Sequence, residues 1–281
     1  METFINKSSR SIIGNDDRMV ADINNTGRWA NVYIKSVFAK SKNKCSGSLI
    51  SDNAVLTAAH CVSNNATEYA ESITVYPGRS NGEMPTGFYE VSKTYTLHDW
   101  QSDIRGKYDY DMAVLIIEPD ENGNYPTDKG APVYSYGYWQ VDFTGVPVRA
   151  YGYPGDHDDE NRTYDVMYEM YNGRVSTMQS DYDKFNNSLN ILSGNQKVTS
   201  ENTLMHSLDT SPGSSGAGIL WRYNGQERII GVNSQQCSTD EDEKVACKDT
   251  DGNEILNTAA RFTKSSYTQV STVVSDNEVK K

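Results

Sequence analysis

Three residues that lie far apart in the sequence have side chains that could act together on a peptide bond. His60 follows small and apolar residues and precedes a cysteine, Asp111 directly precedes the apolar residues 112–117, and Ser215 lies in a turn rich in serine and glycine. A histidine can take and return a proton near neutral pH, and a buried carboxylate beside it fixes its tautomer and stabilises the imidazolium. The turn would allow the N–H groups of Gly213 and Ser215 to hold a developing oxyanion, and each such donor lowers the barrier by about 3 kcal/mol.

Each of these residues has an ordinary structural explanation when it is taken alone. A histidine in an apolar stretch is more often buried for packing, an aspartate often begins a strand, and serine and glycine are common in turns. Asp109 is a rival to Asp111, but only Asp111 directly precedes the apolar run. The order His, Asp, Ser on a chain with a β-type pattern resembles that of the chymotrypsin-type triad, and this resemblance points to nucleophilic catalysis.

The elements that must position these residues are predicted to be short strands. Strand-like runs are separated by Gly, Pro, Asn and Asp, and this spacing is typical of an all-β sandwich or barrel. One segment, residues 264–275 at the C-terminus, is predicted to be a helix. The expected strands are residues 29–38, 48–57, 73–76, 89–96, 112–117, 146–153, 166–171, 203–208, 218–223 and 228–233.

Composition excludes several classes of protein. The 281 residues carry 26 Lys and Arg against 38 Asp and Glu, a formal charge of −12, which argues against a nucleic-acid binder because phosphate contacts need clustered basic residues. The longest apolar run, residues 112–117, is far shorter than the roughly 18 residues that a membrane span requires. We find no ligand cluster typical of a metal or cofactor enzyme and expect neither. Two acidic stretches, residues 156–160 and 240–243, are expected to be solvated loops rather than calcium sites.

Four cysteines bear on the compartment. Cys45, Cys61, Cys237 and Cys247 allow three pairings, and they fall into two local pairs without a CxxC motif. Two disulfides in an exported protein is the economical interpretation. The N-terminal residues lack the apolar core of a signal peptide, so we interpret residues 1–10 as a leader or the remnant of a propeptide.

The three local patterns resemble those of a known family. Residues 57–61, Thr-Ala-Ala-His-Cys, resemble the histidine box of the chymotrypsin-like serine peptidases, and Cys45 resembles the partner cysteine of that box. Residues 111–115, Asp-Met-Ala-Val-Leu, resemble the aspartate box.

A narrower match points to the bacterial glutamyl endopeptidases. Residues 11–18, Ser-Ile-Ile-Gly-Asn-Asp-Asp-Arg, resemble the mature start of that family, together with residues 29–34. Residues 152–156, Gly-Tyr-Pro-Gly-Asp, and the pair Asp209-Thr210 are also similar to that family. These matches span about residues 11–262.

The resemblance implies a fold and a set of roles. It implies two six-stranded antiparallel β-barrels with the active site in the cleft between them and a short C-terminal helix. Residues 11–135 would form the N-terminal barrel with His60 as general base and Asp111 as its orienting carboxylate. Residues 136–281 would form the C-terminal barrel with Ser215 as nucleophile and the helix, and the N–H groups of Gly213 and Ser215 would form the oxyanion hole.

The resemblance also implies which cysteines pair and which region each bridge supports. A Cys45–Cys61 bridge would hold the His60 loop, and a Cys237–Cys247 bridge would close an acidic loop near the specificity pocket.

Specificity for Glu or Asp before the cleaved bond is a further implication. Thr210 matches the pocket threonine of the family, and the α-amine of Ser11, freed by cleavage after Arg10, would bind the substrate carboxylate. The family has a histidine where this chain has Asn233, an uncharged donor that would weaken the preference for Glu over Gln. His206 lies nearby in the sequence, but we do not expect it to compensate.

Two alternatives remain open. Asp209 lies six residues before Ser215, where trypsin-like enzymes place the aspartate that binds Arg or Lys, so cleavage after basic residues is one alternative. The other is a non-catalytic binding protein on a peptidase scaffold. A trypsin-type activation switch is not expected, because Ser214 stands where such zymogens have an aspartate. In the leading hypothesis the protein is a secreted monomer that acts on proteins or peptides, without nucleic-acid or membrane partners.

Overall fold

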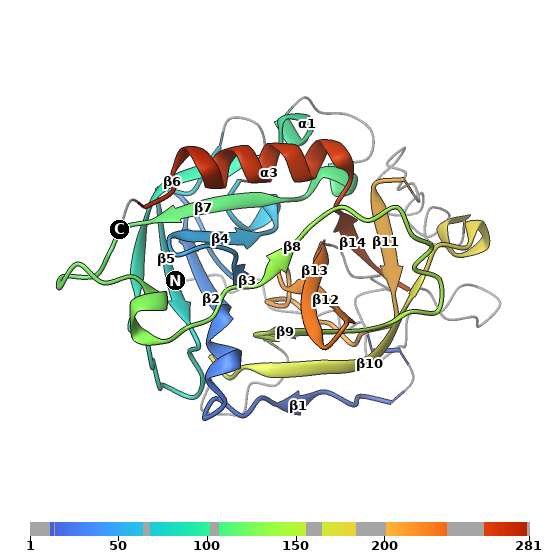
Figure 1. Ribbon diagram of the computed structural model, residues 1–281, viewed down its shortest axis with the longest axis horizontal. Coiled ribbons are helices and arrows are strands. Elements are labelled where there is room, and N and C mark those ends of the chain that lie inside the picture. Colours follow the sequence, from blue (N-terminus) through green and yellow to red (C-terminus); the bar gives the residue numbers. More distant parts are fainter. Residues whose placement is uncertain are drawn as a thin grey trace.

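Antiparallel strands form two closed barrels that lie side by side (Figure 1). The structure, a computed structural model, describes residues 12–13, 15–63, 68–101, 107–155, 165–183, 201–234 and 256–279. Closing a sheet into a barrel pairs its edges and so removes strands that could pair with other chains. None of the described helices has the length and apolarity needed to cross a bilayer.

The first barrel consists of six strands in the cyclic order β2-β3-β4-β7-β6-β5. All of its pairings are antiparallel, and its interior holds Ile34, Leu49, Val55 and Leu115, which are fully buried. The strands are β2 (Asn31–Val37), β3 (Lys42–Leu49), β4 (Ala54–Thr57), β5 (Ser72–Pro77), β6 (Tyr89–Thr96) and β7 (Ala113–Ile117).

The second barrel closes because β9 pairs with both β10 and β12. Its cyclic order is β9-β10-β11-β14-β13-β12, and every pairing in the ring is antiparallel. The strands are β9 (Pro147–Gly152), β10 (Tyr168–Ser176), β11 (Thr203–His206), β12 (Gly218–Tyr223), β13 (Gln226–Asn233) and β14 (Asn257–Arg261). A short strand β8 (Ser135–Tyr136) pairs in parallel with β13. The predicted all-β fold of two six-stranded antiparallel barrels is confirmed.

Each end of the described chain packs on the barrel to which it does not belong in sequence. Strand β1 (Met19–Val20) pairs with β10 of the second barrel. Helix α3 (Lys264–Asp276), which follows the second barrel, lies over β7 of the first barrel (Figure 1). Strand β7 is therefore covered on both faces, by the barrel interior and by α3, and this explains why it is a continuous apolar run instead of an alternating one.

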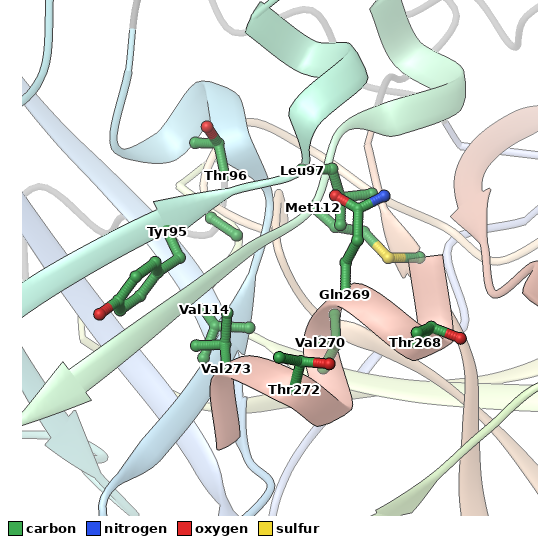
Figure 2. Close-up of a pocket in the computed structure, with 11 residues that line it drawn as sticks. Tyr95, Thr96, Leu97, Met112, Val114, Thr268, Gln269, Val270, Thr272 and Val273 are labelled. Carbon is green, nitrogen blue, oxygen red and sulfur yellow. The ribbon is translucent and has the colours of Figure 1, made fainter. Parts of the chain in front are cut away.

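Helix α3 confirms the predicted C-terminal helix to within one residue. It begins at a capping box in which Thr263 Oγ1 accepts from Ser266 N at 3.1 Å and Ser266 Oγ accepts from Thr263 N at 2.8 Å. Val270, a residue of this helix, is buried. A cavity of about 310 Å³ remains between α3 and strands β6 and β7, and Figure 2 shows the side chains that line it.

Two predictions about strands were wrong in detail. Residues 48–57, expected as one strand, form the end of β3 and the whole of β4, because Ile50 N donates to Ala54 O at 2.9 Å and closes a tight turn through Ser51, Asp52 and Asn53. Strand β14 was not predicted at all. Its sequence, Asn-Thr-Ala-Ala-Arg, has little strand preference, and it is held by pairing with β11 on one side and β13 on the other.

Candidate active site

His60 and Asp111 meet at one end of the pair formed by β4 and β7. The antiparallel register places Thr57 at the end of β4 opposite Ala113 at the start of β7, so the residues just after β4 and just before β7 share one edge. His60 lies in a 3-10 turn, Ala59–Cys61, and Asp111 lies two residues before β7. His60 Nδ1 is 2.6 Å from Asp111 Oδ2, and His60 N donates to Asp111 Oδ1 at 2.9 Å.

The Asp111 carboxylate is fully buried, whereas the His60 side chain is 35% exposed. Burial alone would raise the pKa of Asp111, but attraction to His60 and hydrogen bonds from His60 and Ser234 outweigh it and hold that pKa below its usual value. Ser234 Oγ donates to Asp111 Oδ2 at 2.5 Å. An ionised, fully hydrogen-bonded carboxylate therefore faces one ring nitrogen of a partly exposed histidine.

Asp109, the rival carboxylate, has a different partner. It is buried, and its Oδ1 accepts a short hydrogen bond from the hydroxyl of Thr203 on β11. The two aspartates therefore have different partners: Asp111 contacts His60, and Asp109 contacts Thr203.

The turn that carries Ser215, residues 212–216, is called the serine turn below. Two of its glycines have backbone angles in the left-handed region. Gly213 has φ of +100° and Gly216 has φ of +87°. A Cβ on Gly216 would lie 2.2 Å from Ser46 O, and a Cβ on Gly213 would lie 2.2 Å from Tyr153 O, so no larger residue fits at either position. Within the described part of the chain, the N–H groups of Gly213 and Ser215 donate to no residue, whereas Ser214 N donates to Ser211 O at 2.9 Å.

The disulfide between Cys45 and Cys61 lies between the histidine and the serine turn. It joins β3 to the His60 turn with a Cα–Cα distance of 6.1 Å. The sulfur of Cys61 is 3.9 Å from His60 Nε2 and 3.7 Å from the carbonyl oxygen of Ser215. His60, Asp111 and Ser215 are therefore brought to one place, with the Nε2 side of the imidazole toward the serine turn.

Ser46 of the first barrel bonds directly to the serine turn of the second. Its N–H donates to Ser215 O at 2.7 Å, and its hydroxyl donates to Gly213 O at 2.7 Å. The same hydroxyl accepts from Tyr153 N at 3.0 Å, and Ser46 is fully buried. Sequence reasoning assigned no role to Ser46 or to Ser234, because a buried serine in a strand carries no local signal of a partner in another barrel.

Thr210 and Asn233, expected in the specificity pocket, are both buried beside the serine turn. The Thr210 hydroxyl has no hydrogen-bond partner among the described residues. Asn233 Nδ2 donates to Ser214 O at 3.1 Å, which turns its Oδ1 toward His206 Nε2, also at 3.1 Å. Burial lowers the pKa of His206 to about 4, so this histidine is neutral at neutral pH and adds no positive charge.

The Asp209 carboxylate is bound by the N-terminal part of the chain. Oδ1 accepts from Ile13 N at 2.8 Å, and Oδ2 accepts from Asp17 N at 3.2 Å. Asp209 is only 3% exposed, and burial, reinforced by the charges of Asp17 and Asp16, raises its pKa to about 6 although the two N–H groups oppose the rise. Both oxygens are thus occupied by backbone donors.

Several predicted residues lie outside the described part of the chain. These are Ser11, the cysteines Cys237 and Cys247, residues 1–10, and the acidic stretches 156–160 and 240–243. The amine of Ser11, the second disulfide and the calcium alternative therefore stay as predictions.

A double barrel in which a histidine meets a buried aspartate beside a serine turn defines a chymotrypsin-like serine protease. The model of the family Trypsin matches residues 21–250. The chain accordingly belongs to the trypsin family.

Solved structures with the same fold include two other proteases. A Glu endopeptidase in complex with MPD has a TM-score of 0.68 and 21% identity, covering 94% of this chain and 99% of that one. The protease Anisep from Arthrobacter nicotinovorans has a TM-score of 0.64 and 16% identity, covering 92% and 98%. The predicted likeness to the glutamyl endopeptidases is in agreement with the first of these.

A curated relative matches part of the sequence. An extracellular metalloprotease of Bacillus subtilis (strain 168) is 31% identical over an alignment of 132 residues that covers 44% of this chain. The match spans 42% of that relative, less than half of its length.

The name of that relative raises the question of a metal ion. Among the described residues, one group, Cys45, His60 and Cys61, brings three possible donor atoms within 4.8 Å of one another. Two of these atoms are the sulfurs of a disulfide, which are not thiolates, so His60 is left as the single donor. The described residues of this site do not fit a metal ion.

Proposed function

We propose that this protease is a secreted serine endopeptidase that cleaves after Glu or Asp through an acyl-enzyme. The observation that carries the catalytic part is the 2.6 Å contact between His60 Nδ1 and the buried Asp111 carboxylate, with Cys61 linking the imidazole to the Ser215 turn. The remaining steps follow from what these groups can do.

Catalysis begins with proton transfer from the Ser215 hydroxyl to His60 Nε2. Asp111 keeps the proton of the neutral imidazole on Nδ1, so that Nε2 is free to accept, and it stabilises the imidazolium once the proton has moved. Ser215 Oγ attacks the carbonyl carbon, and the negative charge on the carbonyl oxygen is held by the N–H groups of Gly213 and Ser215.

The imidazolium then gives its proton to the leaving amine, and an ester on Ser215 remains. Water enters, and His60 takes a proton from it as the water oxygen attacks the ester carbon, so that negative charge develops again on the carbonyl oxygen. The imidazolium then returns its proton to Ser215 Oγ as the ester C–O bond breaks and the acid product leaves. The disulfide and Ser46 contribute by keeping the serine turn in register with the first barrel during both halves of the cycle.

Preference for an acidic residue before the cleaved bond is supported by the donors near the turn and by the state of Asp209. The buried Thr210 hydroxyl is an unused hydrogen-bonding group, and Asn233 supplies an amide. Asp209 has both oxygens bound by Ile13 and Asp17, which argues against its use for Arg or Lys. The Ser11 amine would add a positive charge that binds the substrate carboxylate. Because Asn233 stands where the family has a histidine, substrates with Gln before the cleaved bond would also be accepted, though less well than those with Glu.

Secretion is supported by the disulfide and by the relative described as extracellular. Fractionation of the producing cells tests it, and the mature protein is expected in the medium with its N-terminus at Ser11. Recovery of the protein only inside cells with reduced cysteines would contradict secretion.

The catalytic proposal is tested by labelling folded protein with a fluorophosphonate. Labelling is expected on Ser215 and is expected to vanish in Ser215→Ala, which retains any binding role. Absence of labelling in the parent protein would favour a non-catalytic scaffold.

Specificity is tested by sequencing the cuts that the active protein makes in a mixed peptide library. Cuts after Glu, Asp and to a lesser degree Gln are expected, whereas a majority of cuts after Arg or Lys would contradict acidic specificity.

A further inference from the structure

The N-terminal segment, defined here as residues 12–13 and 15–18, forms hydrogen bonds to Asp209 and Ser211, which lie just before Ser215 in the sequence. Two backbone N–H groups of the segment, those of Ile13 and Asp17, occupy the two oxygens of Asp209 at 2.8 and 3.2 Å. Arg18 makes a third contact, in which Nη1 donates to the hydroxyl of Ser211 at 3.3 Å.

These contacts lie on either side of Thr210. Asp209 and Ser211 are its sequence neighbours, and all three residues are at most 3% exposed. Because both neighbours are held by the N-terminal segment, the position of the Thr210 side chain depends on that segment. Thr210 lies five residues before Ser215, so the same contacts bear on the entry to the serine turn.

The segment is itself firmly placed. Arg18 is buried, and Asp16 binds it at two points, Nε to Oδ1 at 2.9 Å and Nη2 to Oδ2 at 2.7 Å. Asn172 Nδ2 on β10 donates to Asp17 Oδ2 at 2.9 Å. The chain then continues into β1, which pairs with β10. An ion pair whose arginine is buried and a strand pairing therefore support the two N–H groups that reach Asp209.

We propose that the backbone N–H groups of Ile13 and Asp17 exclude Lys and Arg from the specificity pocket by occupying Asp209, and that Asp209 is the positioning residue that anchors the N-terminal segment. The inference rests on the proposed function. While the segment is docked, the Asp209 carboxylate is bound by N–H donors and is closed to a cationic substrate side chain, and Thr210 is fixed between two held neighbours. When the N–H donors are absent, Asp209 is a free buried carboxylate that attracts Lys or Arg.

The test removes the donors without touching Asp209. Ile13→Pro with Asp17→Pro eliminates both N–H groups, and the matched pair Ile13→Ala with Asp17→Ala loses the same side chains but keeps both N–H groups. Values of kcat/KM are measured on two peptides that differ only in Glu or Lys before the scissile bond. We expect the Lys-to-Glu ratio to be at least tenfold higher in the proline pair than in the alanine pair.

Adding Asp209→Ala to the proline pair is expected to abolish that gain in Lys cleavage, because no carboxylate is left to bind the cation. Equal ratios in the proline and alanine pairs would overturn the proposal, as would a gain that survives Asp209→Ala.

A second measurement covers the case in which the proline pair does not fold. Amide hydrogen exchange at Ile13 and Asp17 is expected to be at least tenfold faster in Asp209→Ala than in the parent, with unchanged exchange in β7. Unchanged exchange at the two amides would overturn the anchor role, and this readout does not depend on activity.

Fluorophosphonate labelling of every variant separates the two possible failures. An unlabelled parent means that the proposed function fails, whereas a labelled parent with equal ratios means that only the role of the N-terminal segment fails.

Discussion

Two buried aspartates beside the candidate active site, Asp111 of the first barrel and Asp209 of the second, have pKa values shifted in opposite directions. Asp111 of the first barrel faces His60, which can become a cation, and accepts from Ser234 and from a backbone N–H, so its pKa falls below the usual value despite complete burial. Asp209 of the second barrel receives two backbone N–H groups but lies near Asp16 and Asp17, and burial raises its pKa to about 6.

The difference teaches what burial alone does and what a counter-charge adds. Two hydrogen bonds from neutral donors do not overcome desolvation at Asp209, whereas a titratable partner and a hydroxyl do so at Asp111. The Asp111 carboxylate, which the proposed reaction needs in its charged form, thus lies beside a histidine that can become positively charged. The Asp209 carboxylate, which holds the N-terminal segment, meets only neutral backbone N–H donors.

The largest expected effect comes from exchanging Asp111 for asparagine. An amide can donate to His60 Nδ1 and so stabilise the wrong tautomer, and it cannot balance the imidazolium. We expect Asp111→Asn to lower kcat by roughly 10³- to 10⁴-fold with little change in KM.

Asp209→Asn is the matched control from the other barrel. We expect it to lower kcat by less than about 10-fold, because Asp209 touches no reacting atom and its loss acts only through the chain before the serine turn. Steady-state kinetics on one Glu peptide compares the two variants, and equal losses in kcat would remove the distinction between a catalytic and a positioning aspartate.

The second prediction concerns the pH dependence that Asp209 gives to stability. Its folded pKa of about 6 is above the ordinary value of an aspartate, so the folded state holds the proton more tightly than the unfolded state. Its contribution to the free energy of unfolding is therefore greatest below about pH 4 and falls as the pH rises to about 6, by roughly 3 kcal/mol in all. Urea unfolding of Ser215→Ala protein, which does not digest itself, checks this from pH 4 to 7.

Asp209→Asn in the same background is expected to lose that decline. A variant whose unfolding free energy still falls across this window would show that another group is responsible.

His206 supplies a third prediction, with the opposite sign. Its folded pKa of about 4 is below the ordinary value, so protons bind the unfolded state first as the pH falls from about 6.5 to about 4. Stability is lost on acidification by roughly 3 kcal/mol, and His206→Gln is expected to remove this loss. His98→Gln is the control, because the His98 side chain is 82% exposed.

Because the two windows overlap with opposite signs, the parent is expected to have a flatter pH profile than either single variant. A parent profile as steep as that of Asp209→Asn would contradict this compensation.

The sequence was sufficient to predict those site residues whose surroundings in the chain are themselves distinctive. His60 and Asp111 stand at the end of one strand and just before the next, and Ser215 stands in a turn that requires glycine at two positive φ angles. These features depend on residues that are close together in the sequence, and the same is true of the capping box that begins α3.

The contacts between distant parts of the chain could not be predicted in the same way. The hydrogen bond from Ser46 to Gly213 spans 167 positions, and that from Ile13 to Asp209 spans 196. Backbone carbonyl and N–H groups are the partners in these bonds, and every residue carries them, so residue type gives no information about the pairing. For the same reason the sequence leaves a trypsin-like use of Asp209 open, whereas in the structure its oxygens are already bound.

The smallest expected effect concerns Ser46, which tests how far the second barrel depends on the first. Its hydroxyl donates to Gly213 O, so it fixes the peptide unit next to the N–H that we assign to the oxyanion hole. Ser46→Ala removes one hydrogen bond to the turn and leaves the backbone bond to Ser215 O in place. The oxyanion donor then becomes less well placed, and we expect kcat to fall about 10-fold, or about 1.4 kcal/mol, with KM changed by less than twofold.

Ser48→Ala is the matched control, because Ser48 is buried on the same strand two residues further on and its hydroxyl has no partner among the described residues. A purely structural role for Ser46 would lower the unfolding free energy of Ser46→Ala without separating the kcat values of the two variants. A selective loss of kcat in Ser46→Ala would instead show that the first barrel supplies the alignment of the oxyanion donor as well as the histidine and the aspartate. The division of labour seen in the two aspartates would then extend to a neutral side chain: Asp111 and Ser46 of the first barrel act on the rate, whereas Asp209 of the second acts on which substrate is accepted.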